Sequence, residues 1–179
     1  MANRYKKLTK ADQRNTDGGY KNVVLWAPRD TFSQLAMPDP AANTSGASLE
    51  ITDDHTFSTG NGFISWACKQ HSVTLTSESS GDPGAKSMVW TTTFSLLGDS
   101  SSSQEQLEDM LNDDVVMLLK DANCLAATDY VQLGDECNNP EVDVKFDGKT
   151  TAEGRKEYTV SVKVKRAKYF YSGTVTEKP

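Results

Sequence analysis

The last third of the chain alternates between apolar and polar residues with a period of two. Within residues 157–165, Tyr158 and three valines occupy every second position, and charged or hydroxyl-bearing residues fill the positions between them. Residues 142–147 repeat this alternation. A period of two is that of a β-strand with one buried face and one solvated face. The pattern therefore favours an antiparallel sheet with one polar side over a parallel sheet covered by helices.

Strands are also predicted along most of the remaining chain. Apolar runs bounded by turn residues occur at 23–26, 49–52, 63–68, 71–77, 88–97, 115–119, 130–133 and 169–175. The last of these runs carries adjacent aromatic residues, so both of its faces are expected to be covered. Residues 27–48 contain three prolines and predict a long irregular loop. The predicted fold class is mainly β: an antiparallel β-sandwich or barrel with one inserted α-helix and long loops.

The inserted helix is predicted near residues 103–112. Ser102 and Glu105 have the spacing of a capping box at its start. An apolar stripe at helical spacing follows, formed by Leu107, Met110 and Leu111. We expect this stripe to seal one open end or face of the sheet.

Length and composition indicate one domain that starts with an arm. The polar, basic stretch 1–20 predicts an N-terminal arm, and 21–179 predict a single β domain. A hydrophobic content of 36% is low for a bulky monomer. It suits a protein with long loops or one that completes its core by association. No apolar run approaches the roughly 20 residues of a membrane span, so no membrane association is expected.

The charge and the cysteines restrict the possible partners and the redox state. The formal net charge is −6 and the isoelectric point is about 4.9, which argues against a broad surface that neutralises phosphates. Three cysteines, at positions 68, 124 and 137, are odd in number and lack close pairing. We interpret them as reduced, buried thiols rather than as a disulfide framework.

Two glycine-containing strings are similar to nucleotide-binding loops. Residues 81–87 (GDPGAKS) contain the glycine and lysine of a phosphate loop. However, Ala85 separates Gly84 from Lys86, and a strand follows where the phosphate loop needs a helix. Residues 60–65 (GNGFIS) hold two of three dinucleotide-loop glycines and also precede a strand. We interpret both strings as turns.

Residues 97–100 (LGDS) are similar to the Gly-Asp-Ser block of certain serine hydrolases. The catalytic histidine of those enzymes lies near the C-terminus, whereas His55 and His71 both precede the block. A hydroxyl without a positioned base is not an activated nucleophile. We therefore favour a polar turn that leads into the helix. A hydrolase that uses Asp99 or Ser100 stays open, and it predicts a concave pocket where one histidine meets this loop.

Metal and cofactor sites are not predicted. Residues 143–154 match a calcium loop only in part, because Lys145 occupies a ligand position and Gly154 stands where the bidentate glutamate belongs. Cys68 and His71 are three residues apart but lie on neighbouring predicted strands. We expect no catalytic residue, no metal ion and no cofactor.

The closing block, residues 130–176, has the most distinctive sequence. It contains Asp-Gly at 147–148, Glu-Gly at 153–154, the alternating run 158–164 and the aromatic segment 169–175 (YFYSGTV). With the arm, the long early loop and the inserted helix, this block resembles the major tail tube proteins of tailed bacteriophages. The resemblance covers most of the chain in layout and the closing block in sequence.

The resemblance implies a β-sandwich or barrel that forms hexameric rings, which stack into a tube. Double-stranded DNA passes through such a tube during ejection without specific binding, and other tail proteins are partners. The location would be the virion tail, assembled in the host cytoplasm. Related contractile injection machines use the same fold. An acidic chain suits this role, because many phosphate contacts would arrest the DNA.

Two sets of residues are predicted to serve this assembly. The lumen-facing candidates are Glu141, Asp143, Glu157, Thr159 and Ser161. The candidates for contacts between subunits are Tyr5, Trp26, Phe32 and Met37. Lys163 and Lys165 share the polar strand face, so we expect them to pair with acidic neighbours such as Asp143 or to lie outside the channel.

A second class of function explains the sheet pattern equally well. A monomeric β-sandwich can bind a ligand or a partner, for example as a decoration module of a virion or a cell surface. This alternative predicts a monodisperse monomer whose loops are ordered without a partner. The tube subunit instead predicts self-assembly.

Overall fold

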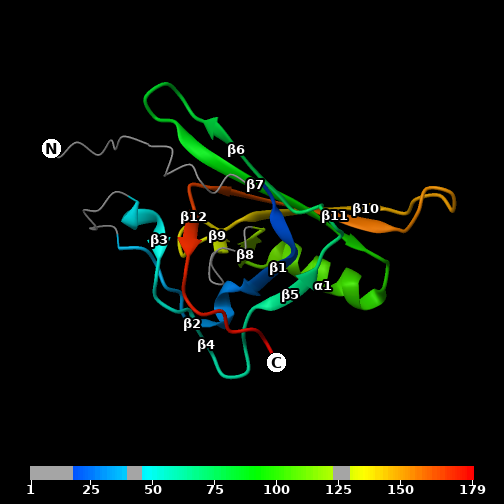
Figure 1. The fold of residues 1–179 in the computed structure, drawn as a ribbon, viewed down its shortest axis with the longest axis horizontal. Helices are drawn as coiled ribbons and strands as arrows, with labels where there is room; N and C mark the ends of the chain where they lie inside the picture. The colour runs from blue at the N-terminus through cyan, green and yellow to red at the C-terminus, as the bar shows by residue number, and fades with distance from the viewer. Residues whose placement is uncertain (1–17, 40–45, 123–129) are drawn as a thin grey trace.

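The computed structural model describes residues 18–39, 46–122 and 130–179, and its main feature is a sandwich of two β-sheets (Figure 1). The six-stranded sheet has the order β3 (Glu50–Ile51), β12 (Lys168–Tyr171), β9 (Tyr130–Leu133), β8 (Val115–Asp121), β1 (Tyr20–Pro28), β5 (Ile64–Ala67). The four-stranded sheet has the order β10 (Glu141–Asp147), β11 (Glu157–Lys165), β7 (Ser87–Leu97), β6 (Thr74–Ser80). All neighbours are antiparallel except β12 and β3. The predicted mainly β fold with one α-helix is confirmed.

The core between the two sheets depends on the alternation that the sequence shows. Tyr158, Val160, Val162 and Val164 of β11 are all buried, and the residues between them face outward or lie at the rim. They pack with Phe94 of β7 and with residues of the six-stranded sheet that include Val24, Trp26, Met117 and Leu133. The strand and its buried face are thus as predicted.

A second apolar layer covers the other face of the six-stranded sheet. We call the segments 29–36, 52–63 and 172–178 the outer layer. It includes the 3-10 turn η1 (Arg29–Thr31) and the strand pair β2 (Phe32–Gln34) and β4 (Thr56–Phe57), while the turn η2 (Ala47–Leu49) precedes β3. Its aromatic side chains pack on Leu118 and Tyr171 of the sheet. β8 is therefore covered on both faces, which explains why its first five residues are all apolar.

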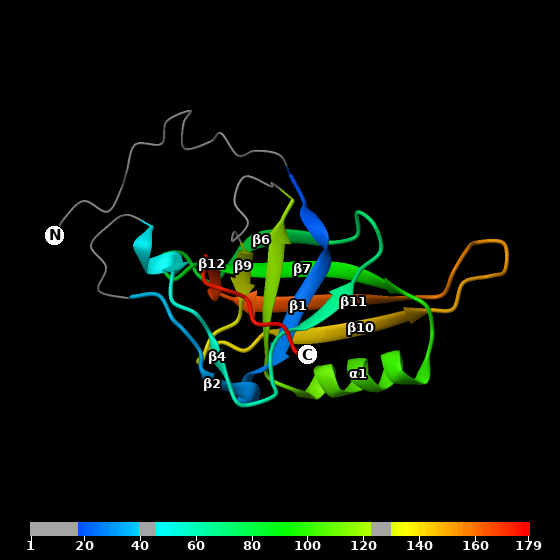
Figure 2. The same ribbon diagram turned by 60° about the horizontal axis from the view of Figure 1, so that its bottom comes forward.

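The helix α1 (Ser101–Asn112) lies alongside β10 and covers one side of the sandwich (Figure 2). Its N-cap is Ser100, whose hydroxyl accepts from the Ser103 amide at 3.1 Å, so the predicted cap at Ser102 is wrong. Leu107 and Met110 are buried in the core, but Leu111 is 42% exposed. Leu111 therefore lies outside the buried part of the predicted stripe.

The last predicted strand is shorter than expected. β12 ends at Tyr171, and the Ser172 amide then bonds to the carbonyl oxygen of Ile51 at 2.9 Å. Phe170 is 50% exposed, so the prediction that both faces are covered is wrong. The four-stranded sheet has two strands fewer than its partner and cannot cover every strand of it.

The strings that are similar to enzyme motifs occupy turns. Residues 81–86 join β6 to β7, and residues 98–100 lead from β7 into α1. Gly81, Gly84 and Gly98 have positive φ angles, a conformation that glycine adopts without strain. In the described ranges, no helix has both the length and the apolar character to cross a membrane.

Candidate functional surface

The outward side of the four-stranded sheet carries a mostly polar surface, on which Val89 and Leu97 of β7 are the apolar members. We call it the polar face, and its polar residues are Thr74, Thr76, Glu78, Thr91, Thr93, Ser95, Glu141, Asp143, Lys145, Thr159, Ser161, Lys163 and Lys165. Alternation along each strand places these side chains opposite the buried valines. The surface includes four of the five predicted lumen residues.

Rows of side chains cross the polar face in register. Asp143 lies opposite Ser161, which lies opposite Thr93, which lies opposite Thr74. The Oγ1 atoms of the two threonines are 2.7 Å apart and share a hydrogen bond. Hydroxyl groups therefore dominate the β6 and β7 half of the surface. Sequence reasoning missed this half, although the TLT and TTT triplets of these strands carry the signal.

The charged residues of the polar face cancel. Three are acidic and three are lysines, and they are Glu78, Glu141, Asp143, Lys145, Lys163 and Lys165. The register places Lys163 directly opposite Glu141 rather than Asp143, which is a favourable cross-strand pair. Lys165 of β11 lies opposite Val89 of β7, and Val89 lies opposite Glu78 of β6. The surface is thus polar and close to neutral rather than strongly acidic.

Glu157 lies at the end of the same face but in a different environment. Its carboxylate is 2.7 Å from Nζ of Lys69 and 3.5 Å from Nζ of Lys149, and its side chain is only 13% exposed. The hydrogen bond from Lys69 lowers the pKa of this carboxyl. Lys149 also pairs with Asp147 at 2.6 Å. Glu157 therefore belongs to an ion-pair cluster at the base of the β10–β11 hairpin and is not a free acidic group of the surface.

The four predicted subunit-contact residues fall in different places. Trp26 is buried in the core of the subunit, where its ring meets that of Trp66 edge-on with 4.9 Å between the centroids. Phe32 is half-buried in the outer layer, where its ring centroid lies 4.3 Å from that of Phe57. Met37 is exposed. Tyr5 lies outside the described residues.

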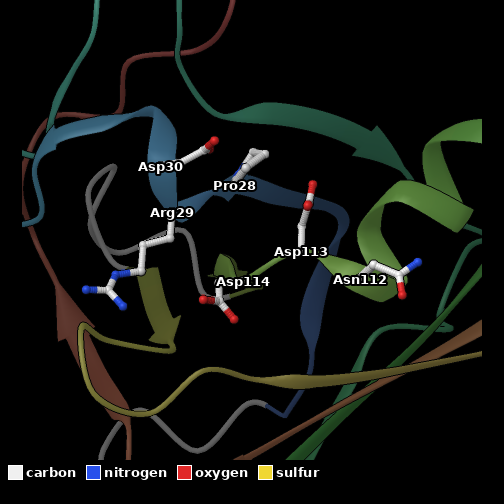
Figure 3. Close-up of a pocket in the computed structure, with 6 residues that line it drawn as sticks. All are labelled: Pro28, Arg29, Asp30, Asn112, Asp113 and Asp114. Carbon is white, nitrogen blue, oxygen red and sulfur yellow. The ribbon is translucent and has the colours of Figure 1, made fainter.

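A shallow hollow of about 560 Å³ lies where β1 ends and α1 ends (Figure 3). Its lining is formed by Pro28, Arg29, Asp30, Asn112, Asp113 and Asp114. The Arg29 amide donates to the carbonyl oxygen of Asp114 at 2.8 Å, which ties the two segments together. Among the described residues, this lining contains carboxylates and one guanidinium but neither a histidine nor a hydroxyl group.

The groups of the hydrolase alternative have structural partners. The Asp99 carboxylate accepts from Nζ of Lys156 at 2.7 Å and from the hydroxyl of Tyr158 at 3.1 Å, and these contacts lower its pKa. Ser100 caps α1, and His55 is buried in the outer layer. The structure thus does not bring His55 to this loop.

The remaining candidate ligands do not converge. Cys68 and Cys137 are free thiols. Cys68 is half-buried, but Cys137 is exposed, so the prediction of a buried thiol is wrong there. Cys124 lies outside the described residues. Within the described part of the chain, no group of three histidine, cysteine or acidic residues is placed to hold a metal ion.

Comparisons with family models, with curated proteins and with solved structures found no significant match to this chain.

Proposed function

We propose that this chain is a structural subunit that assembles into hexameric rings, stacked as a tube like that of bacteriophage tails. The polar face would line the passage for double-stranded DNA. The observation that carries this proposal is a four-stranded antiparallel sheet that combines a polar outer face with two outer strands, β10 and β6. The number of subunits follows from the resemblance to tail tube proteins.

The outer strands are suited to join neighbouring copies. Three antiparallel steps separate β10 from β6, so these two strands run in opposite directions. β6 of one copy can therefore pair with β10 of the next in an antiparallel ladder. In the described ranges, no strand pairs with the outer edge of either one, although α1 lies alongside β10. A ring closed by this contact would leave no edge of the four-stranded sheets exposed.

The chemistry of the polar face suits a conduit. Hydroxyl groups and balanced charges keep the wall hydrated without a net attraction for phosphates. Each additional phosphate contact strengthens binding and its dependence on salt, and many contacts would stop the passage of DNA. Lys163 faces Glu141 across the strands, which reduces its attraction for phosphate.

Mass measurement and negative-stain electron microscopy of the purified chain test the proposal. We expect rings or tubes with a central opening. A monodisperse species at the subunit mass of 19.6 kDa at all concentrations would contradict it and would favour the monomeric binding or decoration module. As a second test, deletion of residues 1–17 should block tube growth and leave a folded subunit, because the first strand of the sheet, β1, begins at Tyr20.

A further inference from the structure

His55 occupies an unusual position for a histidine. It follows β3 in the outer layer and is 3% exposed. Its ring stacks on that of Tyr171 with 4.4 Å between the centroids and an interplanar angle of 4°. The rings of Phe32 and Phe63 meet it edge-on at 5.6 and 5.9 Å. An imidazole in this apolar setting needs a partner for each ring nitrogen.

Two hydrogen bonds fix the tautomer of this ring. Nδ1 accepts from the Ala36 amide at 3.1 Å, so it carries no proton. Nε2 therefore carries the proton and donates to Oε1 of Gln132 at 2.9 Å. Gln132 is itself fully buried on β9, and its Nε2 donates to the carbonyl oxygen of Gly134 at 3.1 Å. Only the neutral ring satisfies this arrangement.

The same residue holds three parts of the outer layer together. Its ring accepts from the segment after β2, and its own amide donates to the Tyr171 hydroxyl at 3.3 Å. That hydroxyl donates to the carbonyl oxygen of Thr174 at 2.7 Å. The Thr174 amide donates to Oδ1 of Asp54 at 2.6 Å. His55 and Gln132 thus link the outer layer to the six-stranded sheet.

Protonation of the ring would disrupt these contacts. A proton on Nδ1 would point at the Ala36 amide, and a charged ring would lie among aromatic side chains with little access to water. Desolvation accordingly lowers the pKa of His55 to about 4, although the Gln132 hydrogen bond and the charge of Asp54 raise it. Of the elements packed on the ring, β12 contributes Tyr171 as a titratable group, and the segment after β3 contributes Asp54.

We propose that the His55–Gln132 pair is an acid-sensitive latch: protonation of His55 releases the outer layer from the six-stranded sheet while the core between the two sheets stays folded. The buried residues of the two regions form separate apolar clusters, with the partly buried Tyr169 packed against both, so one region can open while the other stays folded. The inference does not depend on the assembly of the chain.

Hydrogen exchange of the full chain at pH 7 to 4.5 tests the latch. After correction for intrinsic exchange, the protection of the Ala36 amide should fall by up to about tenfold per pH unit below about 6.5, because the open form takes up one proton. The amides of Val160 and Val162 in β11 should keep their protection. Equal changes in the two regions, or none at Ala36, would overturn the proposal.

Three variants assign the effect to His55. His55→Gln cannot be charged, so its Ala36 protection should be lower at pH 7 but independent of pH. His71→Asn is the matched control, since His71 is exposed, and it should behave like the wild type. Asp54→Asn should retain the pH dependence. A fall that persists in His55→Gln or disappears in Asp54→Asn would contradict the latch. If His55→Gln does not fold, the wild type alone tests the proposal, through the hydrogen-exchange protection of Ala36 compared with that of Val160 and Val162.

Discussion

Leu107 and Leu111 provide a matched pair for measuring how α1 seals the sandwich. Leu107 is 2% exposed in the core, whereas Leu111 is 42% exposed on the same helix. Truncation of a fully buried leucine to alanine costs about 2 to 5 kcal/mol, because transfer free energy is lost and a cavity forms. At Leu111 the loss should stay below about 1 kcal/mol, because much of the side chain is already in water. Any gain in helix propensity is the same at both positions.

The assay is urea unfolding at pH 7, with the midpoint and the slope fitted for the wild type, Leu107→Ala and Leu111→Ala. All three are measured at one protein concentration, because association adds to the apparent stability. In thermal unfolding, each kcal/mol should shift Tm by about 2 to 4 °C for a chain of this size. Similar losses for the two variants would refute the packing of α1 described above, and so would a larger loss at Leu111.

Two further predictions concern close contacts. Asp135 is buried and accepts from the Tyr169 hydroxyl at 2.6 Å, so Asp135→Asn should cost about 1.5 to 3 kcal/mol in urea unfolding at pH 7. Desolvation raises the pKa of Asp135, but the hydrogen bonds to it lower the pKa below 3.8 overall. The cost should therefore shrink as the pH falls below about 4, and a cost that does not change with pH in this range would contradict this. A Cβ on Gly62 would lie 2.6 Å from the Lys178 amide nitrogen, so Gly62→Ala should cost about 1 to 3 kcal/mol in the same assay. The control is Gly148→Ala, which should cost less, because the atom nearest to its Cβ is 3.7 Å away. Equal costs would contradict the close approach at Gly62.

The sequence predicts those parts of the fold that depend on local periodicity. The strand 157–165 and its buried face follow from the alternation alone, and the observed bounds of β11 are the same. The start of α1 is less well predicted, because four consecutive serines, residues 100–103, lie there and each can cap a helix. The exposure of Leu111 depends on which neighbours the helix meets, and helical spacing does not specify them.

The contacts between distant segments could not be predicted. His55 and Gln132 are 77 residues apart, and neither has a local signal that points to the other. Similarly, the polar face was predicted on β10 and β11, but its extension over β6 and β7 depends on strand order. The charge of Glu157 is matched by Lys69, which is 88 residues away. Such pairings follow from topology, and alternation within one strand does not contain that information.

The most direct test of the proposed conduit is a charge reversal on the polar face. Asp143 lies opposite Ser161, so Asp143→Lys places no like charge directly across the β10–β11 pair. The matched control is Asp113→Lys, which changes the same charge beside the hollow at the end of α1. Tubes are assembled from each variant with labelled linear double-stranded DNA, and retained DNA is measured by co-sedimentation at several salt concentrations.

If the polar face lines the passage, Asp143→Lys tubes should form normally and retain DNA at low salt, and the retention should decrease steeply as salt rises. The wild type and Asp113→Lys should retain little. Intact Asp143→Lys tubes that retain no more DNA than the Asp113→Lys control would contradict the proposal that this face encloses the channel.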